Sequence, residues 1–196
     1  MDEPTVYAGD VEAGIADELP GLGLRWCAFA ASGDVTRRSP PALRERLRAL
    51  SDRHRGATAI ALRSRLIPHA YRALFRHVGL DPDVDRIPVE ALMVQRLTRG
   101  AYRSRGLLAD ALTIATLDTE VGVWAVEGDG PLSLRREAGR IVVAGPAGAV
   151  APLFAPPPEV TGATRRLVLY AIAAPGVPGI AVEEALLVAW DVIESG

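Results

Sequence analysis

The stretch from Leu107 to Leu117, LLADALTIATL, is apolar on nearly every side, and it constrains the fold more than any other segment. A helix of this kind must be covered all round, so we expect it at the centre of the molecule. Short strand patterns separated by Gly-rich turns follow it, at 121–126, 132–136, 140–144 and 149–153. Together they predict an α+β fold in three layers, with mainly antiparallel sheets packed around the central helix.

Helical patterns occupy much of the first half of the chain. Ser39, followed by Pro40 and Pro41, predicts a helix start with Ser39 as its cap, and Gly56 ends that helix. Further helices are expected at 68–78, 88–100 and 180–195. Residues 57–66 fit a helix or a strand, and strands are expected at 5–8, 24–30 and 167–173.

Length and composition favour one main domain. The chain has 196 residues, and we expect an N-terminal extension, 1–36, packed on a domain that spans 37–196. The longest uncharged runs are broken by Pro and Gly, so no membrane span is predicted. The acidic N-terminus lacks the pattern of a secretory signal, and the single Cys27 cannot form an internal disulfide. These features predict a cytoplasmic protein.

Charge is distributed unevenly. Residues 37–105 hold 16 Arg and 6 acids, whereas the rest of the chain holds 6 Arg and 18 acids. A basic zone of this kind can face the phosphates of a nucleic acid. The alternative is that the two zones neutralise each other inside the fold.

The standard catalytic motifs are absent. The chain has no Cys pair, no HExxH, no Walker loop, no GxSxG and no GxGxxG after a strand. The three His residues, His54, His69 and His77, all lie on predicted helices, and His69 and His77 are too far apart for one ion on one helix. We expect neither a metal nor a cofactor.

A polar cluster surrounds the central helix. Arg103, Ser104 and Arg105 precede it, and Asp110 and Thr113 lie near its beginning. A buried Asp110 needs a partner, for which Arg103 or Arg72 is the expected type. The pair would either lock the helix or belong to a pocket, which we expect beside the start of the helix with Arg103, Ser104 and Asp110 among its walls.

This region resembles the B3/B4 domain, the editing domain of the phenylalanyl-tRNA synthetase beta chain, which also occurs as free-standing proteins. The family pattern RxINxxVDxxNYVxLxxGxPxHAFD is similar to the segment YRSRGLLADALTIATLDTEVGVWAVE, in which Asp110 takes the place of the family's Asp. Both Asn positions of the pattern are substituted, one of them by Thr113, and the pocket His falls near Gly122 and the closing acid near Ala125. The resemblance extends upstream through YRAL at 71–74, and downstream to Thr161 and Thr164.

The resemblance implies a pocket that holds the aminoacylated 3'-end of tRNA and positions a water, without requiring a protein nucleophile. In that pocket Glu90 or Asp110 would hold the amino group, and these two are the catalytic candidates. The residues expected to bind substrate are Arg72, Arg103, Ser104, Thr113, Gly122, Thr161 and Thr164.

The resemblance implies a free-standing deacylase that clears mischarged aminoacyl-tRNA, with the Arg-rich zone 37–105 binding the tRNA. The alternative is an enzyme or a binding module that takes a small amino-acid derivative in specialised metabolism, without tRNA. A tRNA-acting protein needs a basic surface leading to its pocket, whereas a small-molecule enzyme does not.

Overall fold

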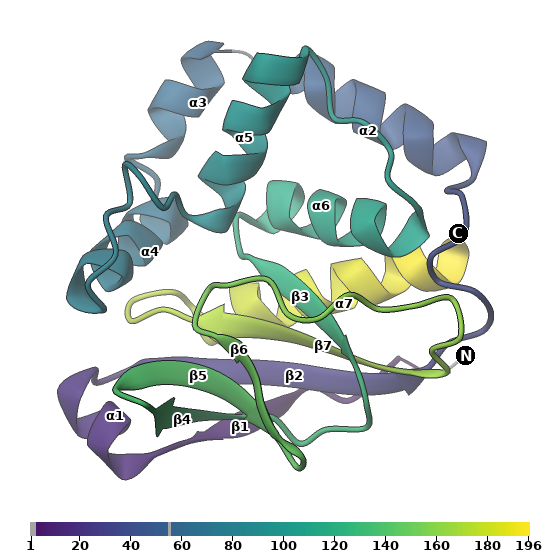
Figure 1. The fold of residues 1–196 in the computed structure, drawn as a ribbon. Helices are drawn as coiled ribbons and strands as arrows, with labels where there is room; N and C mark the ends of the chain where they lie inside the picture. Colours follow the sequence, from purple (N-terminus) through teal and green to yellow (C-terminus); the bar gives the residue numbers. More distant parts are fainter. Residues whose placement is uncertain (1–2, 55) are drawn as a thin grey trace.

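Strands from both halves of the chain form one curled sheet in the computed structural model, which describes residues 3–54 and 56–196 (Figure 1). The strands are β1 (Tyr7–Val11), β2 (Gly23–Ala30), β3 (Val123–Glu127), β4 (Ser133–Glu137), β5 (Arg140–Gly145), β6 (Gly148–Pro152) and β7 (Arg166–Ala173). The helices are α1 (Ala13–Glu18), α2 (Pro41–Arg53), α3 (Gly56–Leu62), α4 (Leu66–His77), α5 (Pro88–Arg99), α6 (Leu107–Thr119) and α7 (Gly179–Ser195). The predicted α+β class is confirmed.

The strand order in the sheet is β3-β7-β2-β1-β4-β5-β6. All neighbouring pairs are antiparallel except β1 and β4, which run parallel. Strand β2 lies between β1 and β7, with Leu24 opposite Ile172. Residues 7–30, which we expected to form an extension, therefore supply two inner strands of the sheet.

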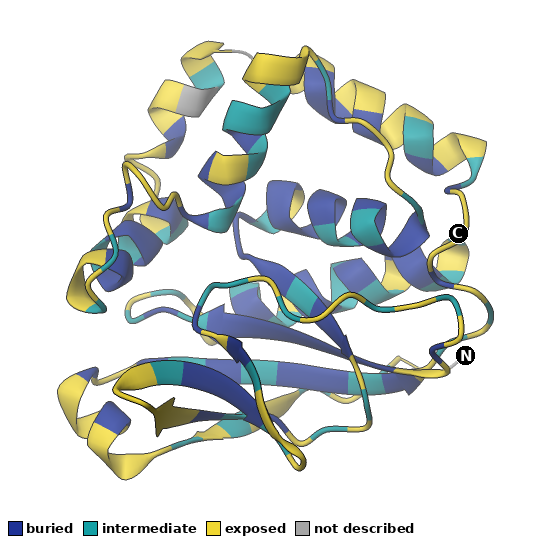
Figure 2. Ribbon diagram, in the orientation of Figure 1, coloured by how far each residue is buried: buried dark blue, intermediate teal, exposed yellow. Residues whose placement is uncertain are grey.

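Helix α6 is central, as its all-round apolar sequence indicates. Leu107, Ala111, Ile114 and Ala115 are fully buried, and the dark band along α6 in Figure 2 continues into the facing side of α7 and into β7. The helix packs against α7, α5, α2 and the strand β3. Helices supply most of the contacts around α6, whereas we expected sheets to surround it. The reason is that β4 joins β1 at the far half of the sheet and carries β5 and β6 away from α6.

One local prediction is wrong, one segment left open is resolved, and one helix was not predicted. Ser39 does not cap the helix that follows it: the N-cap residue is Pro40, without a side-chain hydrogen bond, and the Ser39 hydroxyl bonds elsewhere. The ambiguous segment 57–66 is mostly helical, as α3 and the start of α4. The short helix α1 has only one buried residue, Ile15, so its sequence carries almost no amphipathic signal.

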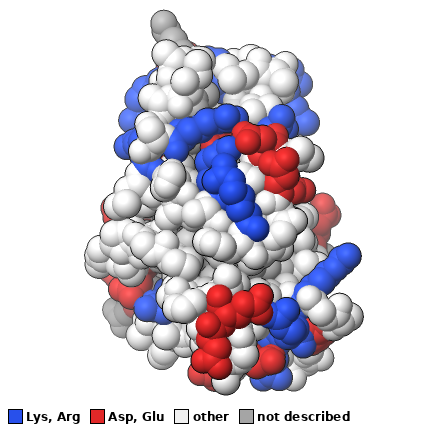
Figure 3. All heavy atoms as spheres, turned by 90° about the vertical axis from the view of Figure 1, so that its left-hand side faces the viewer, with Lys and Arg blue, Asp and Glu red and all other residues white. Residues whose placement is uncertain are grey.

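Among the described residues, no helix combines the length and the apolar character that crossing a bilayer requires. Most Arg, Asp and Glu side chains lie on the surface, and Figure 3 shows several patches of them on the face that it turns to the viewer.

Candidate functional site

A cavity of about 690 Å³ lies between α5, α6, β3 and the segment that follows β6. This volume is within the usual range for small-molecule sites. We call it the first cavity. Its walls are Thr36, Pro88, Ala91, Leu92, Gln95, Arg105, Leu108, Ala109, Leu112, Thr113, Thr116, Val123, Trp124, Ala125, Pro156, Pro157, Pro158, Glu159 and Val160.

Most of the first cavity is apolar. Trp124 lines it and stacks on Tyr170, with ring centroids 5.6 Å apart. A Cβ atom at Gly122 would come within 2.6 Å of Pro88 and 2.8 Å of Trp124. Gly122 does not line the cavity, but its missing side chain allows two of the walls to approach each other.

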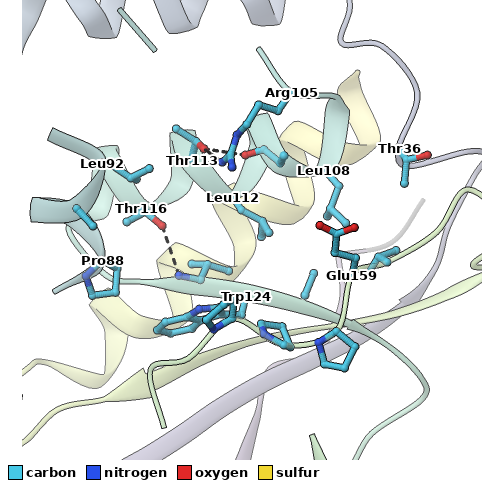
Figure 4. A pocket seen from close by; sticks show the side chains of 18 of the residues that line it. Thr36, Pro88, Leu92, Arg105, Leu108, Leu112, Thr113, Thr116, Trp124 and Glu159 are labelled. Carbon is cyan, nitrogen blue, oxygen red and sulfur yellow. Dashed lines mark hydrogen bonds between the residues drawn. The ribbon is translucent and has the colours of Figure 1, made fainter. Parts of the chain in front are cut away.

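We call the part of the first cavity that Arg105, Thr113 and Glu159 line its polar end; Thr116 lines another part, nearer to Trp124 (Figure 4). The Arg105 guanidinium donates a hydrogen bond to the Thr113 hydroxyl at 3.4 Å, and that hydroxyl donates to the carbonyl of Ala109 at 2.7 Å. Glu159 is on the opposite wall, on the segment after β6. Neither Arg105 nor Glu159 forms an ion pair with another residue of the described ranges. One cationic and one anionic side chain are therefore both available to a ligand at this end.

Four exposed arginines lie on the two segments that supply Thr36 and Arg105 to the cavity walls: Arg37 and Arg38 follow Thr36, and Arg103 precedes Arg105, which itself lines the cavity. They come from two segments that are joined by backbone hydrogen bonds, from Leu107 N to Arg37 O and from Leu108 N to Val35 O, both at 2.9 Å. Gly106, with φ of 114°, lies at the crossing, where a Cβ atom would come within 2.9 Å of the carbonyl oxygen of Thr36. We call these four residues the arginine rim.

Some of the other arginines in the basic zone are paired with acids. Six of the arginines that the structure describes between residues 37 and 105 form ion pairs: Arg46, Arg48, Arg53, Arg63, Arg65 and Arg72. Their partners lie on α2, α5 and α6 and on the loops next to these helices. Internal charge balance thus accounts for these six arginines. Within the described residues, the arginine rim forms no ion pair, and neither do Arg44, Arg76, Arg86, Arg96 and Arg99.

Asp110 is buried, with 1 % of its surface exposed, and no arginine side chain is among its hydrogen-bond partners. One carboxylate oxygen accepts hydrogen bonds from the hydroxyls of Ser39 and Ser104, at 2.6 and 2.5 Å, and the other accepts from the backbone N–H of Arg105 at 2.9 Å. The expected pairing with Arg103 or Arg72 is wrong. Three neutral donors at the start of a helix satisfy the carboxylate instead.

Arg72 pairs with Glu90 in a second buried cluster. Nη1 of Arg72 lies 2.8 Å from Glu90 Oε2, and Nη2 lies 2.8 Å from Asp83 Oδ1. The side chains of Arg72 and Glu90 are 8 % and 7 % exposed, and neither lines the first cavity. The contacts of Glu90 are those of a structural ion pair that joins α4 to α5.

Thr113 is the one member of the predicted site that lines the first cavity. Arg103, Ser104 and Asp110, which we expected among its walls, are not part of the lining. Arg103 and Ser104 are exposed on the adjoining loop.

The two predicted threonines lie beyond the segment 156–160. Thr164 is fully buried and donates a hydrogen bond to Glu127 at 3.2 Å, whereas Thr161 is exposed.

Sequence reasoning missed Trp124, Arg105 and Glu159 as wall residues. Counting the family pattern residue by residue from Asp110 places the pocket His at Trp124 and the closing acid at Glu127, not near Gly122 and Ala125. This count would have found Trp124. Nothing in the local sequence marks Glu159.

The described residues contain no group of three or more His, Cys, Asp and Glu placed to bind a metal ion. His54 is the most enclosed of the three His residues, and its Nδ1 lies 3.1 Å from the Tyr102 hydroxyl. Burial lowers the pKa of His54, with a smaller contribution from Arg53, which favours the neutral imidazole.

Comparisons with models of protein families, with curated proteins and with solved structures found no match to this chain. The residues of the first cavity and of the arginine rim therefore carry the functional argument.

Proposed function

We propose that this chain hydrolyses the ester bond of aminoacyl-tRNA in trans, with the amino acid and the terminal adenosine held in the first cavity. The observation that carries the proposal is the arginine rim, whose four exposed residues lie on the two segments that bring Thr36 and Arg105 to the walls of a cavity large enough for both groups. Phosphates of the tRNA 3'-end would contact the rim, since Arg forms strong bidentate hydrogen bonds with them.

Positioning would supply most of the acceleration. The Arg105 guanidinium, which contacts Thr113, offers hydrogen-bond donors at one wall, and Glu159 faces it from the other. Donors aimed at a developing oxyanion typically contribute a factor of about 10²–10³ each. Glu159 would hold either the ammonium group of the substrate or the attacking water. This arrangement needs no protein nucleophile, which agrees with the absence of a triad motif from the sequence.

The deciding experiment is a deacylation screen with a full panel of charged tRNAs, combined with binding at several salt concentrations. The double variant Arg38→Gln, Arg103→Gln alters the rim without touching the cavity walls. It should lower the slope of log K against log salt by about 1.4, at roughly 0.7 for each phosphate contact to a single strand. Arg135→Gln, an exposed arginine on β4, is the matched control and should leave the slope unchanged.

A second candidate function is supported by the ion pairs of the basic zone. If the arginines serve charge balance, the first cavity belongs to an enzyme or a binding module for a small amino-acid derivative. A tRNA panel without hydrolysis, together with tRNA binding that does not depend on salt, would favour this candidate. Hydrolysis of amino-acid ethyl esters by the wild type, reduced in Thr113→Val, would then identify an enzyme.

A further inference from the structure

A second cavity, of about 700 Å³, lies on another side of the molecule, between the end of α4 and the hairpin of β4 and β5. It also includes the end of β6 and the loop before α5. Its walls are Glu18, Phe75, His77, Val78, Gly79, Leu80, Asp85, Arg86, Arg136, Gly139, Arg140, Ile141, Pro152, Leu153, Phe154 and Ala155. None of the residues of the predicted site takes part in it.

The inner wall of the second cavity is apolar. Phe154 packs on Phe75 with ring centroids 4.5 Å apart, and Ile141, Val78 and Leu153 complete the wall. Phe154 is only partly covered, so some of its ring surface is available. A wall of this kind takes up apolar groups because contact with them removes its surface from water.

The rim of the second cavity is basic. Arg136 forms an ion pair with Glu18, and the Asp85 carboxylate accepts a hydrogen bond from the backbone N–H of Asp81 at 2.8 Å. Arg86 and Arg140, in contrast, form no ion pair and no side-chain hydrogen bond with the rest of the described chain. Two guanidinium groups at the cavity are therefore available, whereas both acids of the rim already have partners.

The backbone is strained at the same place. Within residues 3–54 and 56–196, four residues other than Gly have a positive φ: Arg86, Glu120, Ala138 and Phe154. Glu120 is the C-cap of α6, and Ala138 lies in the tight turn between β4 and β5, so two are explained by local structure. The other two, Arg86 with φ of 53° and Phe154 with φ of 64°, both line the second cavity. Strain of this kind concentrates at ligand sites.

We propose that the second cavity binds a small organic anion, a carboxylate or a phosphate carried on an apolar group. The apolar group lies against Phe154 and Ile141, and the anion contacts Arg86 and Arg140. Binding in this position uses the two free guanidinium groups and covers the exposed part of the Phe154 ring. The proposal does not depend on the function proposed for the first cavity.

The test is calorimetric titration of the whole chain with two probes, phenyl phosphate and phenylacetate, which separate phosphate from carboxylate as the preferred anion. Inorganic phosphate has the anionic group without the apolar group, and benzyl alcohol has the apolar ring without the anion. Each should bind at least tenfold more weakly than the better probe. Arg140→Gln and Arg86→Gln should each weaken that probe about tenfold or more, which corresponds to the loss of one charged contact.

Two control variants locate the site. Arg135→Gln removes a neighbouring arginine outside the second cavity, and Thr113→Val alters the first cavity, so both should bind the probe as the wild type does. Thermal melting of each variant, run first, separates loss of binding from loss of fold. Failure of both probes to bind at about 10 mM, or equal binding by wild type, Arg86→Gln and Arg140→Gln, overturns the proposal.

Discussion

Replacing Asp110 by Asn and by Ala should distinguish a structural carboxylate from a catalytic one. In the structure, Asp110 joins Ser39, Ser104 and the backbone of Arg105 through three hydrogen bonds. Asn keeps the shape of the side chain. Its amide oxygen can still accept from Arg105, and its NH₂ group can donate to both hydroxyls, because a hydroxyl is also an acceptor.

The two changes differ in expected cost. Ala loses three hydrogen bonds to a charged group, each contributing about 1.5–3 kcal/mol, but part of this is regained because Ser104 is exposed and can bond to water. Ser39 is only 2 % exposed, so its hydroxyl would be left without an acceptor. We expect a loss of about 4 kcal/mol in the free energy of unfolding for Asp110→Ala. For Asp110→Asn we expect about 1–2 kcal/mol, since only the charge is lost.

Urea unfolding monitored by circular dichroism measures both values. With a slope near 2 kcal/mol per molar urea, the midpoint should fall by about 2 M for Asp110→Ala and by about 0.5–1 M for Asp110→Asn. Equal shifts for the two variants would refute the hydrogen-bond argument. A stably folded Asp110→Asn that has lost hydrolysis completely would instead assign Asp110 a direct part in the chemistry.

Three further predictions follow from buried groups. Glu90→Gln should lower the free energy of unfolding by about 3 kcal/mol, because the buried Arg72 guanidinium then loses the negative charge of Glu90. Urea unfolding measures the loss. Gly122→Ala should lower the free energy of unfolding by about 1–3 kcal/mol and displace Trp124, which a change in tryptophan fluorescence would report. A variant with unchanged stability and fluorescence would contradict the close contact of Gly122 with Trp124. Burial raises the pKa of the Cys27 thiol to about 12, so a thiol reagent at pH 8 should label it only after denaturation, and rapid labelling of the folded chain would show that the strand opens.

Elements with a strong local pattern could be predicted from the sequence. The buried helix α6 and the strands that follow it are within a few residues of their expected positions, because apolar periodicity and Gly-rich turns determine them locally. Strand β1 was expected at 5–8 and lies at Tyr7–Val11, since its exposed residues give little pattern.

Features that depend on distant contacts could not be predicted. Ser39 and Asp110 are 71 residues apart, so nothing in the sequence next to Ser39 indicates that its hydroxyl serves Asp110 and not its own helix. The residues that line the first cavity could not be predicted for the same reason. Glu159 reaches the cavity because of the path of the segment after β6, and that path depends on tertiary packing.

The pairing of β2 with β7 also determines when the sheet can form during synthesis. Ala28 lies opposite Val168 and Leu24 opposite Ile172, so nearly 150 residues must be made before β2 meets this partner. At about 5–20 residues per second, the ribosome needs roughly 7–30 s for that length. During this interval the apolar side chains of β2 lack the neighbour that covers them in the finished sheet. Contacts this far apart in sequence also slow refolding of the complete chain, since a large loop must close before they form. The nascent chain should therefore bind general chaperones through residues 23–30 until β7 has left the ribosome.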